Sequence, residues 1–265
     1  MRKAFVCTFL VVIALGICGS AGAQEMDVQR RNSLYDLPPR WLVDMPTAGT
    51  MHRGYYQIGL RIYPEGGGLG YTDIGLSSRF MLGISYGAED VISNRDPNWN
   101  PRIGFSLKFR VIDELEYFPA IAVGYTDQGF GAWNSEYDRY TFKSRGFYAV
   151  ASRSFYFYKW TSGWHAGINY SLENDVDHED DIDGWAGIDA TFNYNLGLVL
   201  EYDLALNDNK TAPYSGKGRG YLNASIKWLF NENLEIEVIA KDLLVNRRES
   251  ETFTREIRLT YIDSF

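Results

Sequence analysis

The sequence predicts an all-β protein: a transmembrane, up-and-down antiparallel β-barrel of about twelve strands that follows a cleaved signal peptide. Three observations support this fold class. Successive segments alternate apolar and polar residues with a period of two, as strands between two environments do. The connections between these segments are alternately short and long, as in outer-membrane barrels. The chain also ends on an aromatic residue, Phe265, which closes the apolar face of its last segment.

Residues 1–23 have the three parts of a secretory signal peptide. Basic residues at 2–3 precede an uncharged apolar stretch over 5–18, and Ala21-Gly22-Ala23 supplies small residues for cleavage before Gln24. Both cysteines of the chain lie in this segment, so the exported protein is expected to contain no disulfide bond. Export and a barrel together predict the cell outer membrane of a Gram-negative bacterium.

The composition excludes two classes of protein. The signal peptide carries two of the 26 basic residues, which leaves 24 against 34 acidic residues and a net charge of −10 for the rest of the chain. This acidity argues against nucleic acid as a partner. No segment after the signal peptide has 18 consecutive apolar residues, so helical membrane spans are excluded.

Twelve segments have the alternating pattern of a strand. The even positions over 196–206 are apolar, for example, whereas the odd positions include Glu201 and Asp203. One face of such a strand suits lipid and the other a polar lumen. The alternation is weakest near Arg153, where a β-bulge is expected to shift its phase. The predicted strands are 54–63, 69–77, 79–91, 101–112, 118–127, 145–158, 162–173, 184–193, 195–207, 219–230, 233–244 and 254–265.

The lengths of the connections distinguish a membrane barrel from a soluble β-sandwich, which would also alternate. With both ends of the chain in the periplasm, turns on that side should be short and outer loops long. The short turns are expected at 78, 112–117, 159–161, 194 and 231–232. The long loops are expected at 93–100, 128–144, 174–183, 208–218 and 245–253, and only the first outer loop, 64–68, is short.

Aromatic residues mark the expected membrane boundaries and the end of the chain. Tyr261 and Phe265 on the last apolar face are the expected signal for the barrel-assembly machinery, although Asp263 stands where an apolar residue is usual. Outer-membrane lipid is the other expected partner. Six tryptophans fall near predicted strand ends or loops, where they would form interfacial girdles: Trp99, Trp133, Trp160, Trp164, Trp185 and Trp228.

The face opposite the lipid is heavily charged and is expected to form a polar network in the lumen. Twelve strands enclose little more than their own side chains and a narrow channel, so these charges must pair or stay hydrated. Two interpretations are open: a salt-bridged, closed interior and a narrow hydrophilic conduit. The residues are Arg61, Asp73, Lys108, Arg110, His165, Asp189, Glu201, Asp203, Lys227, Glu235, Glu237, Lys241, Glu256 and Arg258.

The sequence offers little for catalysis or metal binding. His165, the only histidine predicted inside the barrel, could form a dyad with a lumen aspartate, but an ordinary polar network is favoured. No G-x-S-x-G motif marks a serine nucleophile. The acidic run 173–183 could bind Ca²⁺, but Ala190 stands where a bidentate Glu should close a calcium loop, which favours a solvated outer loop. No catalytic residue, metal or cofactor is predicted.

Residues 24–53 separate the signal peptide from the predicted barrel over 54–265. This stretch is too polar and too often interrupted by proline to form a strand or a helix. It is expected to be either a periplasmic lead-in or a plug segment that tucks into the barrel.

Seven short stretches carry a resemblance to a known family. In chain order they are Val43-Asp-Met-Pro-Thr-Ala48, Gly59-Leu-Arg-Ile-Tyr63, Gly83-Ile-Ser-Tyr-Gly87, Asp96-Pro-Asn-Trp-Asn100, Phe118-Pro-Ala-Ile-Ala122, Gly146-Phe-Tyr-Ala149 and Gly167-Ile-Asn-Tyr-Ser171. Together they resemble the YjbH-like proteins. The resemblance implies an outer-membrane β-barrel tied to the biosynthesis or export of extracellular polysaccharide. Larger members look like two-barrel proteins, whereas this chain has strands for one barrel.

The residues and the resemblance together favour a non-enzymatic outer-membrane barrel that assists export, assembly or surface display of extracellular polysaccharide. The glycan and its export proteins would then be further partners. Trp99, Trp133 and Tyr137 are the candidate glycan contacts, because aromatic faces in exposed loops suit sugars. The alternatives are a barrel hydrolase that acts on lipid or peptide and a generic narrow diffusion pore.

Overall fold

The computed structural model describes residues 38–158, 160–192, 195–210 and 214–265 of the chain. The predicted signal peptide over 1–23 and the first part of the predicted lead-in, 24–37, lie outside the described residues. Within the described ranges, no helix is long and apolar enough to cross a membrane.

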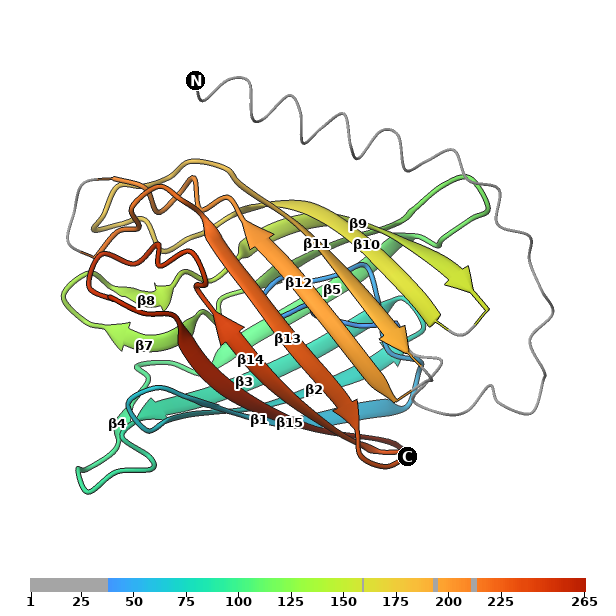
Figure 1. Ribbon diagram of the computed structural model, residues 1–265, viewed down its shortest axis with the longest axis horizontal. Helices are drawn as coiled ribbons and strands as arrows, with labels where there is room; N and C mark the ends of the chain where they lie inside the picture. Colours follow the sequence, from blue (N-terminus) through green and yellow to red (C-terminus); the bar gives the residue numbers. More distant parts are fainter. Residues whose placement is uncertain (1–37, 159, 193–194, 211–213) are drawn as a thin grey trace. The chain divides into compact units, whose positions relative to one another are not determined.

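The chain forms a closed antiparallel β-barrel of twelve strands (Figure 1). Each strand pairs with the next barrel strand along the chain, and β1 pairs with β15 to close the sheet. Closure leaves no free edge, as a membrane barrel requires. All twelve predicted strands are confirmed, with ends that differ by a few residues. They are β1 (Tyr55–Tyr63), β2 (Gly67–Ser77), β3 (Phe80–Glu89), β5 (Gly104–Ile112), β6 (Ala120–Thr126), β9 (Gly146–Phe157), β10 (Trp160–Tyr170), β11 (Asp183–Phe192), β12 (Leu196–Asp203), β13 (Tyr221–Leu229), β14 (Leu234–Lys241) and β15 (Thr254–Ser264).

The connections alternate in length, as predicted. One end of the barrel, the short-turn end, carries the connections 78–79, 113–119, 158–159, 193–195 and 230–233. The other, the long-loop end, carries 64–66, 90–103, 127–145, 171–182, 204–220 and 242–253. The chain terminates at the short-turn end (Figure 1).

Three short strands lie in the long loops and were not predicted. β4 (Asn98–Trp99) pairs with the end of β3. β7 (Phe130–Asn134) and β8 (Arg139–Phe142) form a hairpin of their own at the long-loop end (Figure 1). Strands of two to five residues are too short for a period-two pattern to be recognised in sequence.

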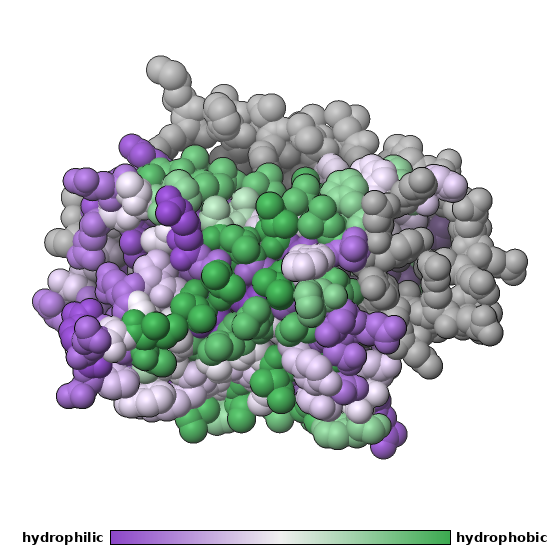
Figure 2. Space-filling model, turned by 60° about the horizontal axis from the view of Figure 1, so that its bottom comes forward, coloured by the Kyte–Doolittle hydropathy of each residue, from purple (hydrophilic) through white to green (hydrophobic). Residues whose placement is uncertain are grey.

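The barrel is apolar outside and polar inside. On β12 the side chain of Leu200 is 48% exposed, whereas that of Glu201, on the opposite face, is completely buried. Figure 2 shows apolar residues gathered over the strands and hydrophilic residues at the long-loop end. Because a soluble protein has the reverse arrangement, the outer face of the barrel suits the hydrocarbon core of a bilayer.

The bulge predicted near Arg153 is wrong. β9 pairs with β10 in unbroken register from Tyr148 to Phe157, and the irregularity lies at Tyr170, which is opposite both Gly146 and Phe147. The guanidinium of Arg153 instead donates to backbone carbonyls of the turn 113–119. The adjacent turn thus stabilises the charge of Arg153, and β9 keeps its alternation without a bulge.

Aromatic side chains gather near both ends of the barrel. At the short-turn end the ring of Trp160 stacks on that of Phe157, with 4.0 Å between centroids. At the long-loop end Trp99 stacks on Tyr86 at 5.4 Å. Trp185 does not join a girdle as predicted, because it lies on the lumen face of β11, where it is 2% exposed.

The last residue of the chain packs onto the start of the barrel. The ring of Phe265 lies 5.0 Å from that of Tyr56, and the amide of Phe265 donates to the carbonyl of Gly54 at 3.0 Å. Asp263, the unusual acid on this face, accepts a hydrogen bond from the hydroxyl of Tyr261 at 2.8 Å. The terminal aromatic therefore helps to close the barrel between its first and last strands.

We expect deletion of Phe265 to slow insertion and to lower the amount of protein in the outer membrane. The deletion removes the contact with Tyr56 and the terminal aromatic of the assembly signal. The measurement is the protein level in fractionated membranes, with Phe265→Tyr, which keeps an aromatic ring, as the control. Equal levels for the deletion variant and the wild type would show that the terminal ring is incidental.

Candidate functional site

Residues 38–51 form a hairpin inside the barrel, which we call the plug hairpin (Figure 1). A backbone hydrogen bond from Leu42 N to Met45 O, at 2.8 Å, closes its tip. Near its base, the hydroxyl of Thr50 donates to the carbonyl of Ser78 at 2.8 Å. Since Ser78 is in a short turn, the hairpin enters from the short-turn end. Of the two places left open by the sequence for residues 24–53, the buried part of the segment, residues 42–51, occupies the lumen, whereas His52 and Arg53 are exposed.

Apolar side chains of the plug hairpin supply much of the core. Leu42 and Val43 are completely buried and belong to one cluster with Trp185 and Val199 of the barrel wall. Gly187 permits the close approach, because a Cβ at this position would lie 2.4 Å from Cδ1 of Leu42. Among the described residues, the lumen at this level is therefore filled by packed side chains of the hairpin and the wall.

A single carboxylate holds the tip of the plug hairpin. Oε2 of Glu201 accepts hydrogen bonds from the amides of Val43, Asp44 and Met45 at 2.9, 2.8 and 2.8 Å. Oε1 of Glu201 accepts a fourth from Asn223 at 2.8 Å. Three successive amides that converge on one anion form a backbone nest, which gives this hairpin a specific seat on β12.

The side chain of Asp44 points the other way, toward two cations of the wall. Its carboxylate lies 2.8 Å from Nη1 of Arg61 and 2.5 Å from Nζ of Lys241. Arg61 also bonds Glu256 at 2.5 Å. Burial by itself raises the pKa of Asp44, but the charges of Lys241 and Arg61 outweigh it and hold that pKa well below its usual range. Asp44 is therefore an anion in the lumen.

Arg258 binds the backbone of the plug tip. Its two terminal nitrogens donate to the carbonyls of Val43 at 3.0 Å and Leu42 at 2.9 Å. Its Nε donates to Glu237 at 2.6 Å. The guanidinium thus joins the wall and the plug hairpin with one planar fork of donors.

Two lysines bind other carbonyls of the plug hairpin. Nζ of Lys108 donates to the carbonyls of Arg40 at 2.6 Å and Gly49 at 3.2 Å. Nζ of Lys227 donates to the carbonyl of Trp41 at 3.3 Å. Five cations from the wall therefore meet oxygen atoms of the plug hairpin.

His165 lies in a chain of hydrogen bonds that ends on the plug hairpin. Its Nε2 is 2.7 Å from Oδ1 of Asp189, and its Nδ1 is 2.7 Å from Oγ of Ser152. Because a carboxylate accepts from Nε2, Nδ1 is assigned as the acceptor for the serine hydroxyl. The amide of Ala48 donates to the same Oγ at 2.8 Å. The order Ser–His–Asp is that of a catalytic triad, but here the hydroxyl is buried beneath the plug hairpin.

Asp73, Arg110 and Glu235 are among the predicted lumen residues that have no direct hydrogen bond to the plug hairpin in the described structure. Asp73 accepts a hydrogen bond from Gln57 at 2.6 Å on the wall. Arg110 lies at the rim of the short-turn end, where it pairs with Asp113 at 3.0 Å. Glu235 is half-buried near the same end. The predicted network thus has a central group that holds the plug hairpin, a pair of residues near the rim, and Asp73, which is linked to the hairpin through Gln57 because Gln57 accepts a hydrogen bond from Nε of Arg40 at 3.1 Å.

Folded loops cover the barrel at the long-loop end through a second set of buried ion pairs. Their cations come from the loop 127–145, and their carboxylates come from loops 171–182 and 204–220 and from the end of β12. Of its members, the sequence predicted only Asp203 as a lumen residue; the cluster itself was not predicted, because its members are distant in the chain and most lie outside the alternating segments. The pairs are Arg139 with Asp177 at 3.1 Å and Asp208 at 2.8 Å, Lys143 with Asp177 at 2.6 Å, and Arg145 with Asp203 at 2.9 Å.

The acidic run 173–183 is not the fully solvated loop that the sequence favours. Glu179 is 1% exposed, and its carboxylate accepts hydrogen bonds from the amides of Asn209 at 2.8 Å and Lys210 at 3.0 Å. Glu173 is also buried, and burial raises its pKa. In the described ranges no group of three or more His, Cys, Asp or Glu side chains is placed to hold a metal ion. These carboxylates join the loops to one another.

The three candidate glycan contacts are not brought together. Trp99 lies against Tyr86 on the outer face of the barrel. The ring of Trp133 meets the edge of Tyr140, with 4.9 Å between centroids. The ring of Tyr137 packs on Tyr214 at 3.9 Å. Trp133 and Tyr137 belong to the β7–β8 hairpin, whereas the stack that contains Trp99 is an element of the outer aromatic girdle.

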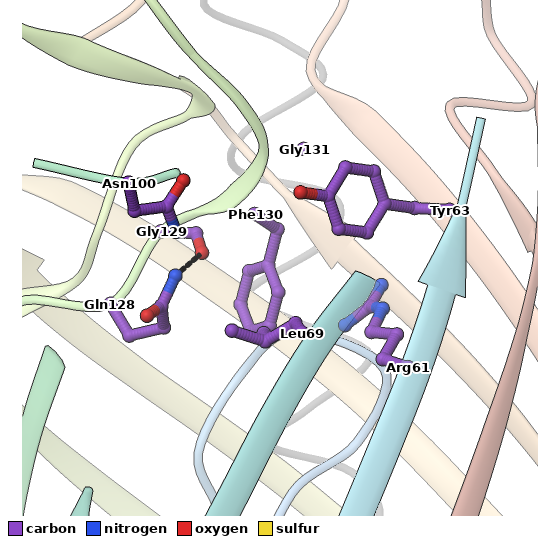
Figure 3. Close-up of a pocket in the computed structure, with 8 residues that line it drawn as sticks. All are labelled: Arg61, Tyr63, Leu69, Asn100, Gln128, Gly129, Phe130 and Gly131. Atoms are coloured by element: carbon purple, nitrogen blue, oxygen red, sulfur yellow. Dashed lines mark hydrogen bonds between the residues drawn. The ribbon is translucent and has the colours of Figure 1, made fainter. Parts of the chain in front are cut away.

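A narrow pocket, too small to hold a water molecule, lies between the wall and the loop that leads into β7 (Figure 3). Arg61 and Phe130 line it, with the guanidinium carbon 4.4 Å from the ring centroid. Nη2 of Arg61 and Oδ1 of Asn100 face this region without a hydrogen-bond partner in the described structure. Polar groups thus continue from the plug tip toward the long-loop end.

Comparisons with known proteins give only structural likenesses. No family model matches the sequence, and no curated protein sequence is significantly similar to it. A solved structure of the KdgM porin is similar at 12% identity with a TM-score of 0.46, covering 80% of this chain and 99% of that chain. A structure of the NanC porin is similar at 7% identity with a TM-score of 0.43, covering 79% of this chain and 99% of that chain.

Proposed function

We propose that this chain is a non-enzymatic outer-membrane barrel that assists export, assembly or surface display of an extracellular polysaccharide, with the plug hairpin as its closure. The observation that carries the proposal is the way in which the hairpin is held. Among the described residues, no backbone-to-backbone hydrogen bond joins residues 38–50 to a strand. Side chains of the wall hold the hairpin instead, and water or a polar ligand can replace each such contact.

The resemblance to YjbH-like proteins is the reason for proposing a polysaccharide as the substrate. Its first stretch, Val43 to Ala48, is the tip of the plug hairpin and touches Glu201, Arg258 and Ser152. The segment of the chain that suggests the family is thus also the segment that closes the lumen. A generic diffusion pore would have no need of a closure with so specific a seat.

Hydrolysis is a second candidate function, because Ser152, His165 and Asp189 are hydrogen-bonded in the order of a triad. In a hydrolase, loss of the histidine would remove general-base catalysis, which typically contributes about 10²- to 10⁴-fold in rate. In a structural network, the same change removes one link between the wall and the plug hairpin.

We expect His165→Ala to leave extracellular glycan output largely intact in a strain that depends on this protein. Output of surface polysaccharide is the measurement, and heat-modifiable migration on gels confirms that the variant is folded in the membrane. A complete deletion of the gene is the control and should reduce output strongly. Normal output in the deletion strain would refute the polysaccharide role. Loss of output in folded His165→Ala protein would favour the hydrolase.

A further inference from the structure

We infer that the plug hairpin occupies the binding site of an acidic linear glycan, and that Asp44 and the backbone carbonyls stand in for the carboxylate and oxygens of its uronic-acid units. The inference rests on the proposed function and names the class of its substrate. It predicts that such a glycan and the plug hairpin compete for the same cations.

The first step concerns which atoms the plug hairpin presents to these cations. Arg61 and Lys241 meet the carboxylate of Asp44. Lys108, Lys227 and Arg258 donate hydrogen bonds to backbone carbonyls of the hairpin. Nζ of Lys108 also lies 5.1 Å from the ring centroid of Trp41. One carboxylate among neutral acceptor oxygens is also the pattern of a sugar acid, in which hydroxyl and ring oxygens surround each carboxylate.

The second step concerns what the cations lose when the hairpin leaves. Without the hairpin, Arg61 would still have its hydrogen bond to Glu256, and Arg258 would still have its hydrogen bond to Glu237. In the described structure, by contrast, every hydrogen bond or ion pair of Lys108, Lys227 and Lys241 is to the plug hairpin. Without the hairpin all three lysines lose their hydrogen-bonded oxygen atoms, and Lys241 keeps only the rings of Phe130 and Phe142, whose centroids lie 4.9 and 3.6 Å from its Nζ. Lysines without oxygen acceptors in a narrow lumen would be costly. An anionic ligand rich in acceptors is therefore the occupant that best replaces the hairpin.

The third step concerns the arrangement of the charges on the wall. Four charged residues lie in one row across neighbouring strands. In this row, Lys227 on β13 is opposite Glu237 on β14, Glu237 is opposite Arg258 on β15, and Arg258 is opposite Arg61 on β1. Barrel strands are tilted by about 35–45°, so a row along the hydrogen-bonding direction climbs obliquely through the lumen. The row forms a basic track for an extended chain, and its one carboxylate is already bonded to Arg258.

The test measures release of the plug hairpin by sugars in the full-length protein. Both native cysteines lie in the predicted signal peptide, so a Met45→Cys variant carries a single reporter thiol in the exported chain. Residue 45 is 1% exposed, and its rate of reaction with a soluble maleimide reports release. The probes are an oligoglucuronate and a neutral cello-oligosaccharide of equal length.

We expect the oligoglucuronate to accelerate labelling and the neutral sugar to leave it unchanged. Adding Asp44→Asn, which weakens the competitor, should raise the affinity for the oligoglucuronate by about tenfold, the equivalent of one charge-assisted hydrogen bond. Adding Lys227→Gln should lower that affinity by a smaller factor, because the change also removes the 3.3 Å hydrogen bond from Lys227 to the Trp41 carbonyl of the hairpin. Lys227 is half-buried and takes no part in the ion pairs of Asp44. The Lys227→Gln variant alone therefore tests the inference if Asp44→Asn does not assemble.

Equal effects of the two sugars, or no effect of either, would overturn the inference. A normal glycan output in the deletion strain would overturn the proposed function itself. The two failures are distinguishable, since the first is measured on purified protein and the second in cells. Acceleration by the charged sugar that does not respond to Lys227→Gln would place the binding site away from the track and would also refute the inference.

Discussion

Glu201→Ala is expected to release the plug hairpin and to raise the ion conductance of the barrel in planar bilayers. The wild-type carboxylate is completely buried and accepts the amides of Val43, Asp44 and Met45. Each buried amide left without an acceptor costs about 1–3 kcal/mol. A loss of even ~3 kcal/mol shifts the equilibrium between seated and released hairpin by about a hundredfold.

A matched control for this variant is Asp73→Asn. Asp73 is another buried carboxylate of the lumen, but it bonds Gln57 and Ser106 on the wall and is linked to the plug hairpin only through the hydrogen bond from Arg40 to Gln57. Its loss should leave the conductance low. Glu201→Gln, which retains an acceptor oxygen, should have an intermediate effect. A conductance of Glu201→Ala equal to that of the wild type would mean that apolar packing of Leu42 and Val43 alone seats the hairpin.

Leu200→Arg is expected to destabilise the barrel by about 2–4 kcal/mol, the cost of a cation near the middle of the bilayer on a barrel surface. Leu200 lies on the outer face of β12, where it is 48% exposed. The measurement is the free energy of unfolding in denaturant for protein reconstituted in lipid vesicles. The cost arises because the guanidinium must leave water or distort the bilayer to remain hydrated.

Leu204→Arg is the matched control for the lipid face. Leu204 is also on the outer face, is 43% exposed and follows the last residue of β12 at the long-loop end. Near the interface the same change should cost only about 0–1 kcal/mol. Val199, which neighbours Leu200, is unsuitable as a control because it belongs to the same buried cluster as Leu42 of the plug hairpin. Equal costs at positions 200 and 204 would contradict the assigned depth of β12.

The strands were predictable because a barrel in lipid imposes its pattern locally. Leu200 must meet hydrocarbon, and Glu201, one residue along, must meet the lumen, so the period of two is visible in any short window. The same rule places Trp185 in the lumen, although its nearness to a strand end suggested a girdle. The strand's phase is thus a better guide to the facing of a residue than its distance from a strand end.

The partners of the lumen charges were not predictable in the same way. Asp44 meets Arg61 and Lys241, which are far apart in the sequence, on β1 and β14. Arg139 meets Asp177 and Asp208 across three different loops. Nothing periodic relates these residues, since ion pairs form wherever the fold brings opposite charges together in a place that water cannot solvate.

By itself, therefore, the sequence determined the class of barrel, the strands, the face that each strand presents and the alternation of short and long connections, because each of these reflects the two solvents of a membrane barrel. Only the tertiary structure decided that residues 38–51 lie in the lumen, that Glu201 binds their amides, and that loops 127–145 and 171–182 cover the long-loop end. The physical reason is that these choices depend on closure of the barrel. Closure fixes which lumen charges face one another, and the plug hairpin and the loops then fold to satisfy them.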